Sequence, residues 1–195
     1  MAIARVCVFC GSSPGSTPAF AELATRVGRV LAARGIGLVY GGASVGLMGH
    51  MAGGALSAGG EVIGVIPQAL VDMEVAHTGL SDLRVVGTMH ERKALMADLA
   101  DAFLALPGGI GTLDELFEVL TWSQLGLHSK PTGLLDLDGY FAPLLAFLDG
   151  AVNARFLQPI HRAMLLLDDD PERLLDAFQA YEAPPPFKWV DRPLR

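Results

Sequence analysis

The sequence has little charge, few cysteines and no long apolar run. Charged residues make up 18% of the 195 residues, and 14 Lys and Arg against 21 Asp and Glu give a net charge of −7. An acidic chain without a basic run is not expected to bind nucleic acid, which proteins hold through contacts between cations and phosphates. No stretch approaches the roughly 18 consecutive apolar residues that a membrane span needs, so no membrane partner is predicted. The first ten residues lack the basic region of a signal peptide, which makes the cytoplasm the expected location.

The sequence gives little support for a metal site or for a redox-active pair of cysteines. The only cysteines, Cys7 and Cys10, lie inside a strand pattern, where a spacing of three places their side chains on opposite faces. This favours two structural thiols over a redox pair at the start of a helix. Two cysteines cannot form a four-cysteine zinc site, and the five histidines show no metal-binding spacing. We therefore predict no structural metal and no cofactor.

Glycine, by contrast, is abundant, with 23 residues. Many glycines follow short runs rich in Val, Ile and Leu, which is typical of buried parallel strands. The predicted strands are residues 5–9, 37–40, 61–66, 83–86, 102–106, 131–135 and 164–167. The predicted helices between them are residues 18–34, 47–58, 89–100, 112–125, 140–152 and 171–181. This alternation predicts an α/β fold, a single Rossmann-like domain over residues 1–183 with a mostly parallel sheet and helices on both faces, followed by a Pro-rich C-terminal arm at residues 184–195.

The connection over residues 67–82 is long and irregular. It contains Asp72, Glu74, His77 and Asp82. Long irregular connections in compact domains are often functional. A short helix at residues 68–73 followed by a surface loop explains the same sequence, so both interpretations stay open.

The glycine-rich turn at residues 107–111 is the best candidate for a ligand site. Ligands of an open parallel sheet bind outside the carboxyl ends of the strands. The glycines let the backbone approach a ligand, and the next helix directs free N–H groups and its positive end to the same place, which favours a phosphate. The turn is not a Walker A loop, and Asp114 stands where the third glycine of the dinucleotide fingerprint belongs.

Glu115 has two interpretations. Thr112-Leu-Asp-Glu115 matches a capping box, in which Thr112 is the N-cap and Glu115 bonds back to its N–H. Alternatively, the carboxylate serves a cationic centre next to the bound phosphate. The local sequence does not separate the two.

A second turn, residues 87–93, contains two cations where a helix should begin. Thr88-Met-His-Glu91 is again a capping box, which predicts a helix start at Met89 and places Arg92 and Lys93 near its first turn. Cations there work against the helix dipole, which favours a functional role over a solvated face. Because the next strand leads directly to the 107–111 turn, we expect the two turns to be neighbours.

Two further turns open on the same edge of the sheet. Gly11 and Ser12 belong to the first of them, and Gly41 and Gly42 to the turn at residues 41–49, which could line a ribose or a phosphate. Glycines 46 and 49 of that turn could instead only allow close packing of a helix on a strand. Met48 and Met89 could contact a base, although methionines beside a helix start also fill cores.

At these residues the sequence resembles the Lonely Guy family of cytokinin riboside 5′-monophosphate phosphoribohydrolases, proteins often labelled possible lysine decarboxylases. The resemblance rests on Pro107-Gly-Gly-Ile-Gly-Thr-Leu-Asp-Glu115 and Met89-His-Glu-Arg-Lys93, and the 41–49 turn is also similar. It implies a homodimer with a Rossmann-like fold. It also implies hydrolysis of the N-glycosidic bond of a nucleoside 5′-monophosphate to free base and ribose 5-phosphate.

The resemblance also implies roles for individual residues. Arg92 and Glu115 match the catalytic positions of the family. The positions that match substrate contacts are Glu74, Lys93, Gly109, Ile110, Gly111, Thr112, Leu113, Asp114 and Thr121. Asp114 stands where many members have Glu, a small departure that should not remove activity. The motifs do not distinguish AMP from its N6-isoprenoid derivatives.

Two other functions compete with this interpretation. A pyridoxal-phosphate lysine decarboxylase would need a Schiff-base lysine, and Lys93 is one of only three lysines in a chain that is short for such an enzyme. A non-catalytic nucleotide or cofactor carrier could share the fold and the glycine turns. A carrier does not require the pair of Arg92 and Glu115, so the pair favours the enzyme.

Overall fold

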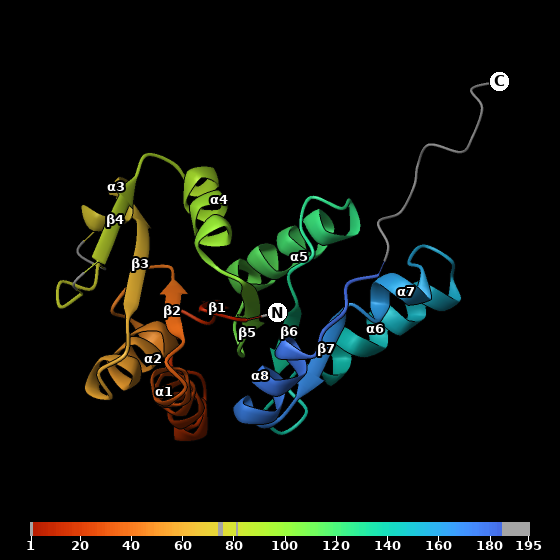
Figure 1. The fold of residues 1–195 in the computed structure, drawn as a ribbon, viewed down its shortest axis with the longest axis horizontal. Coiled ribbons are helices and arrows are strands. Elements are labelled where there is room, and N and C mark those ends of the chain that lie inside the picture. Colours follow the sequence, from red (N-terminus) through yellow and green to blue (C-terminus); the bar gives the residue numbers. More distant parts are fainter. Residues whose placement is uncertain (1, 74–75, 81, 185–195) are drawn as a thin grey trace.

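A computed structural model describes residues 2–73, 76–80 and 82–184 of the chain. Its strands are β1 (Arg5–Phe9), β2 (Gly37–Tyr40), β3 (Val62–Pro67), β4 (Asp82–Val86), β5 (Ala102–Ala105), β6 (Thr132–Leu135) and β7 (Leu165–Asp168). Its helices are α1 (Pro18–Ala33), α2 (Gly46–Ser57), α3 (Gln68–Val71), α4 (Met89–Leu99), α5 (Ile110–Gln124), α6 (Ala142–Asn153), α7 (Pro159–Arg162) and α8 (Pro171–Gln179) (Figure 1). The predicted α/β fold is confirmed. The short helix α7 was not predicted, and the C-terminal arm lies outside the described residues apart from Pro184.

The seven strands form one sheet in the order β4-β3-β2-β1-β5-β6-β7, and every pair of neighbours is parallel. From β1 to β4 the chain moves outward in one direction, and from β5 to β7 it moves outward in the other. The order therefore reverses between β1 and β5. Ligands of open α/β sheets bind at this switch point, outside the carboxyl ends of the strands.

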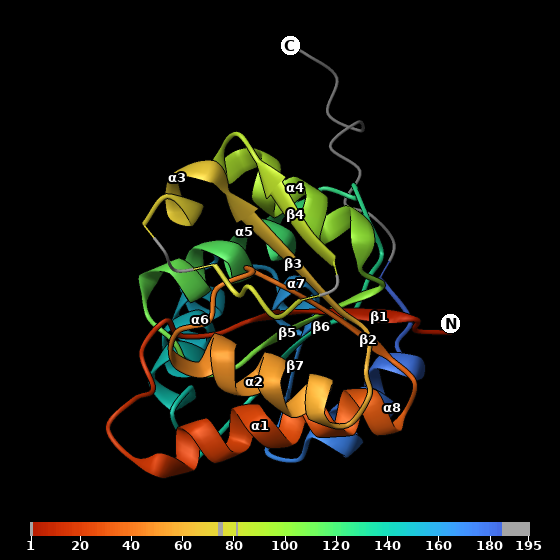
Figure 2. The same ribbon diagram turned by 90° about the vertical axis from the view of Figure 1, so that its left-hand side faces the viewer.

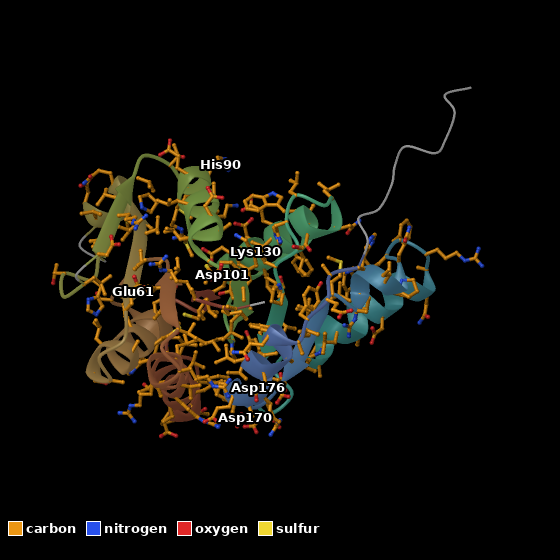
Figure 3. All side chains as sticks on the ribbon, in the orientation of Figure 1. Glu61, His90, Asp101, Lys130, Asp170 and Asp176 are labelled. Atoms are coloured by element: carbon orange, nitrogen blue, oxygen red, sulfur yellow. The ribbon has the colours of Figure 1, made fainter. Side chains whose placement is uncertain are left out.

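Helices cover both faces of the sheet and close two hydrophobic cores. Helices α1, α2 and α8 contribute to one core, and α4, α5 and α6 contribute to the other (Figure 2). Cys7 lies in the second core and Cys10 in the first, as the strand spacing predicts, and both thiols are free. Ion pairs with Asp170 and Asp176 tie α8 to α1 (Figure 3).

Helices α1 and α2 approach each other so closely that only glycine fits at two positions. A Cβ atom placed on Gly28 would lie 2.1 Å from the carbonyl oxygen of Met51, and one on Gly54 would lie 2.4 Å from that of Thr25. At both positions the nearest atom belongs to the backbone, which cannot move aside as a flexible side chain can. The close contact fixes α2 against α1.

The connection from β4 to β5 determines how the candidate catalytic residues meet. These strands are not neighbours, because β3, β2 and β1 lie between them. Helix α4 crosses this gap and packs against β3, β2 and β1. The expectation that the two turns are neighbours because they follow consecutive strands was therefore wrong in its reason. The crossing helix, and not the order of strands along the chain, brings its first turn to α5, where Arg92 pairs with Glu115 and Lys93 with Asp114.

Two searches of the described residues gave negative results. No helix among them combines the length and the apolar character that a membrane crossing requires. The same part of the chain contains no group of three or more His, Cys, Asp or Glu side chains that could hold a metal ion.

Candidate active site

The glycine turn after β5 runs directly into α5. Gly109 is the N-cap and the helix begins at Ile110, two residues before the predicted start. Thr112 is therefore not the N-cap but a buried residue of the first turn. The amide of Leu113 bonds to the carbonyl oxygen of Gly109 (3.2 Å). The amides of residues 110–112 precede this bond and so have no partner inside the helix.

Packing requires glycine at only one of three positions in this turn. A Cβ atom on Gly108 would lie 2.1 Å from the hydroxyl oxygen of Thr112, so packing alone requires glycine there. No described atom lies within 4 Å of a Cβ atom placed on Gly109 or on Gly111. Packing does not require these two glycines, and they leave open space above the free amides of α5.

Close packing also explains two glycines of the 41–49 turn. A Cβ atom on Gly46 would lie 2.3 Å from the backbone of Ser12, and one on Gly49 would lie 2.1 Å from the carbonyl oxygen of Ser44. Both glycines therefore serve close packing. Gly41 is different, because a Cβ atom there would face the guanidinium group of Arg92 at 3.5 Å.

The first turn of α4 is capped as the sequence predicts. The hydroxyl of Thr88 accepts a hydrogen bond from the amide of Glu91 (3.1 Å), and the helix begins at Met89. The Glu91 carboxylate accepts from the amide of Gly87 (2.7 Å), one residue before the N-cap. This cap fixes where Arg92 leaves the helix.

Arg92 and Glu115 form a buried ion pair. Nη2 of Arg92 donates to Oε1 of Glu115, and the two side chains are only 12% and 9% exposed. Glu115 is thus bonded to a side chain of α4 and not to the start of its own helix, so the capping-box interpretation of Glu115 was wrong. Nε of Arg92 is buried and has no hydrogen-bond partner among the described residues. The guanidinium group keeps donors that a ligand can use.

The surroundings of Glu115 favour its protonated form more than water does. Burial raises the pKa of the carboxyl group above its usual range, and the nearby charge of Arg92 offsets this only in part. A carboxylate that is desolvated but held by one cation is a strong base and a strong electrostatic partner for a developing positive charge.

These groups line a cavity of about 420 Å³ at the switch point of the sheet. This volume falls within the roughly 300–1,000 Å³ of small-molecule sites. Ten predicted site residues line the cavity: Gly11, Ser12, Gly41, Met48, Arg92, Gly109, Ile110, Gly111, Thr112 and Glu115. Sequence reasoning missed five further lining residues: Val8, Cys10, Ala43, Val45 and Leu70. Their apolar side chains carry no pattern that separates a cavity wall from core.

The other predicted site residues that the structure describes do not line this cavity. Lys93 pairs with Asp114 (3.1 Å) and with Glu118 (3.2 Å) on α5. The hydroxyl of Thr121 donates to the carbonyl oxygen of Phe117 (2.6 Å), two turns further along α5. Leu113 packs against the core, and Met89 is exposed on the first turn of α4. Glu74 lies outside the described residues.

Gly42 joins the long 67–82 connection to the site. It has a φ of 73°, which favours glycine, and its carbonyl oxygen accepts a hydrogen bond from the amide of His77 (2.8 Å). The connection contains the short helix α3, from which Leu70 reaches the cavity. The short helix of this segment is confirmed, and its functional role stays a prediction.

Two other cavities are less suited to chemistry. One of about 330 Å³ adjoins the site on the α1 side and is lined mainly by the serines and glycines of the first turn. A groove of about 610 Å³ runs along α1, where Arg26 and Arg34 already pair with acidic residues of α8. Neither places a buried base beside a buried cation.

Comparisons with known proteins show which proteins this chain is similar to. A family model described as "Possible lysine decarboxylase" matches residues 48–178. A rice protein (Oryza sativa subsp. japonica) named "Probable cytokinin riboside 5′-monophosphate phosphoribohydrolase LOGL6" is 49% identical over 91% of this chain and 71% of its own length. A "Cytokinin riboside 5′-monophosphate phosphoribohydrolase" of Rhodococcoides fascians is 49% identical over 90% of this chain and 89% of its own. The solved molybdenum cofactor binding protein from Rippkaea orientalis is 24% identical, with a TM-score of 0.70 over 92% of this chain and 98% of its own, a likeness that shows the fold alone.

Proposed function

Because this chain belongs to the family of cytokinin riboside 5′-monophosphate phosphoribohydrolases, we propose that it hydrolyses the N-glycosidic bond of a purine nucleoside 5′-monophosphate. The products are free base and ribose 5-phosphate, and the substrate is a cytokinin riboside or adenosine 5′-monophosphate. One observation carries the proposal: a buried pair of Arg92 and Glu115 borders the cavity into which the free amides of α5 open.

The start of α5 is suited to hold the 5′-phosphate. The unbonded amides of residues 110–112 and the positive end of the helix dipole favour an anion at this point. Gly109 and Gly111 leave room for phosphate oxygens to approach these amides. A phosphate fixed here would orient the ribose for reaction, which is a large source of catalytic power.

Glu115 is placed to act on the sugar. Cleavage of a glycosidic bond passes through an oxocarbenium-like state in which the ribose ring becomes positively charged. The Glu115 carboxylate would stabilise this charge and take the proton of the water that attacks C1′, while the bonding electron pair leaves with the base. Arg92 would hold the carboxylate in place and direct its remaining donors to the phosphate.

Lysine decarboxylation fits the site less well. Burial acts to lower the pKa of Lys93, but hydrogen bonds with Asp114 and Glu118 outweigh it and raise the pKa. The ammonium form, which these carboxylates stabilise, cannot form a Schiff base.

A homodimer is part of the same proposal, and it rests on the resemblance of the motifs to those of the family. Light scattering on the eluting peak of a size-exclusion column measures the mass directly. A mass near twice 20.6 kDa supports the dimer, and a mass near 20.6 kDa argues against it.

Product analysis tests the activity. The protein and its Glu115→Gln variant are incubated separately with AMP, isopentenyladenosine 5′-monophosphate, GMP, CMP and unphosphorylated adenosine. We expect free base and ribose 5-phosphate from a purine monophosphate, no product from adenosine, and no turnover by the variant. Nucleotide binding without release from any substrate would overturn the proposal and favour the carrier.

A further inference from the structure

Arg92 and Lys93 are adjacent residues in the first turn of α4, but their side chains have different surroundings. Arg92 borders the cavity, whereas Lys93 points to α5 and contacts Asp114 and Glu118. The Lys93 side chain is only 11% exposed although it carries a charge. A lysine that bound a phosphate in this cavity would have to leave both carboxylates.

The two carboxylates differ in how much they depend on Lys93. Asp114 is largely exposed, and water can replace its partner. Oε2 of Glu118 is buried, and its ion pair with Lys93 is the one interaction that the described residues provide for it. Loss of Lys93 would leave a buried carboxylate oxygen without a partner, which is unfavourable.

The rest of this turn contributes little to its placement. Met89, His90 and Glu91 are all exposed to solvent. The links from this turn to α5 are the two ion pairs of Lys93 and the one pair of Arg92. These links come from adjacent residues of α4 and reach α5 within the span Asp114 to Glu118, so each restricts the movement of the other.

We propose that Lys93 is a positioning residue: its pairs with Asp114 and Glu118 fix the first turn of α4 against α5 and so hold Arg92 at Glu115, without contact between Lys93 and the substrate. The inference rests on the proposed function. It assigns Lys93 to the support of the catalytic pair, whereas the resemblance of the sequence motif places this residue among the substrate contacts.

Steady-state kinetics separate the two roles of Lys93. The variants are Lys93→Met and the double variant Asp114→Asn/Glu118→Gln, which removes both partners but keeps the lysine. A misplacement of about 1 Å can lower a rate by about 100-fold. We expect both variants to lower kcat by about 10- to 100-fold while KM stays within about threefold of the wild-type value, and the combined triple variant to be no worse than Lys93→Met alone.

A substrate contact predicts a different pattern. Lys93→Met would then raise KM, and the double variant would retain the wild-type kcat because the lysine remains free to bind. That result would overturn the inference. A Lys93→Arg variant, which can still reach both carboxylates, should recover most of the lost kcat, and no recovery would also count against it. Arg162→Met, which removes a partly buried cation of a remote ion pair, serves as the control and should leave kcat unchanged.

The pH dependence of kcat is a second test, because a residue with a purely structural role would leave this pH profile unchanged. Charged and titratable groups of α4, α5, β1 and the turn after β1 act on or near Glu115: Arg92, Lys93, Asp114, Cys7 and Cys10. Among them, the charge of Lys93 lowers the pKa of Glu115 and that of Asp114 raises it. Both variants would also release Arg92, whose charge lowers the pKa of Glu115 more strongly than Lys93 lowers it or Asp114 raises it, so the acid limb of kcat should move to higher pH in both. Unmoved limbs in both would overturn the inference.

Failure of the inference is distinct from failure of the proposed function. If the wild-type protein releases no base from any monophosphate, the proposed function fails. If the wild type is active and only KM changes in Lys93→Met, the proposed function stands and the positioning role fails. Circular dichroism on each variant confirms that the kinetics report folded protein.

Discussion

Gly111→Ala should make the protein more stable and less active. Gly111 lies in the first turn of α5, has no positive φ, and a Cβ atom added there meets no described atom within 4 Å. Alanine in place of a helical glycine at such a position restricts the unfolded chain at no cost in the folded one. The same methyl group would stand in the open space that the proposed 5′-phosphate needs.

The expected magnitudes follow from these two effects. A compatible Gly→Ala replacement stabilises by about 0.4–1 kcal/mol, which for a chain of this size raises Tm by about 1–4 °C. Hydrogen bonds to a charged group contribute about 1.5–3 kcal/mol each. Loss of one amide-to-phosphate bond should therefore lower kcat/KM by about 10- to 100-fold, since 1.4 kcal/mol corresponds to a factor of ten.

Helix α2 provides a matched control. Gly53 is also an exposed helical glycine, no described atom lies within 4 Å of its added Cβ atom, and it does not line the cavity. Gly53→Ala should raise Tm by a similar amount and leave kcat/KM unchanged. Thermal unfolding by circular dichroism and base release from a nucleoside monophosphate measure the two quantities.

Two results would refute the reasoning. If Gly111→Ala kept the wild-type kcat/KM, the phosphate would not bind over the amides of residues 110–112. If both alanine variants lowered kcat/KM equally, the loss would come from general rigidity and not from the methyl group at the site. A fall in Tm for Gly111→Ala alone would mean that the space above α5 is not open.

Three further predictions follow from packing and burial. Burial raises the pKa of Glu115 and the carboxylate is the active form, so kcat should rise as the pH passes through that raised pKa. Because the pKa of Glu115 is higher in the folded than in the unfolded protein, the same titration should lower the free energy of unfolding as pH rises. A pH–rate profile checks the first effect, and urea unfolding at several pH values checks the second. Gly54→Ala, whose Cβ atom would lie 2.4 Å from the carbonyl oxygen of Thr25, should destabilise by about 1–3 kcal/mol in urea unfolding, and an unchanged midpoint would argue against the close α1–α2 contact. Burial raises the pKa of Cys7, so a thiol reagent should label this thiol only after denaturant unfolds the protein, and rapid labelling of Cys7 in the native protein would contradict its burial.

The local elements of this fold could be predicted from the sequence because their signals are local. Short Val-rich and Ile-rich runs between glycine and proline identified all seven strands within two residues of their ends. The start of α4 was predicted correctly because Thr88 caps it through its own side chain. The start of α5 was not, because Gly109 caps that helix with its backbone alone, which leaves no side-chain pattern to recognise.

The site could be predicted only in part, because its decisive contacts are not local. Thr112-Leu-Asp-Glu115 matches the sequence pattern of a capping box, and this pattern is the same whether Glu115 bonds to its own helix or to another element. Arg92, 23 residues earlier in the chain, decides the outcome by offering a buried charge that the backbone cannot match. The apolar wall of the cavity, including Leu70, was missed because burial in a cavity and burial in a core select the same residue types.

The strand order explains why the pair of Arg92 and Glu115 comes from two helices and not from two strand ends. With β5 next to β1 and β4 at the far edge, the chain must cross three strands between them, and α4 makes this crossing on the α5 side of the sheet. A cation at the first turn of such a helix lies near the carboxyl edge and faces its neighbour helix across the switch point. An acid one turn into α5 is then the nearest group that can pair with it. The free amides of α5 lie less than two turns from that acid along the same helix. A single topological feature thus places the free amides of α5 and a buried acid–cation pair around one cavity.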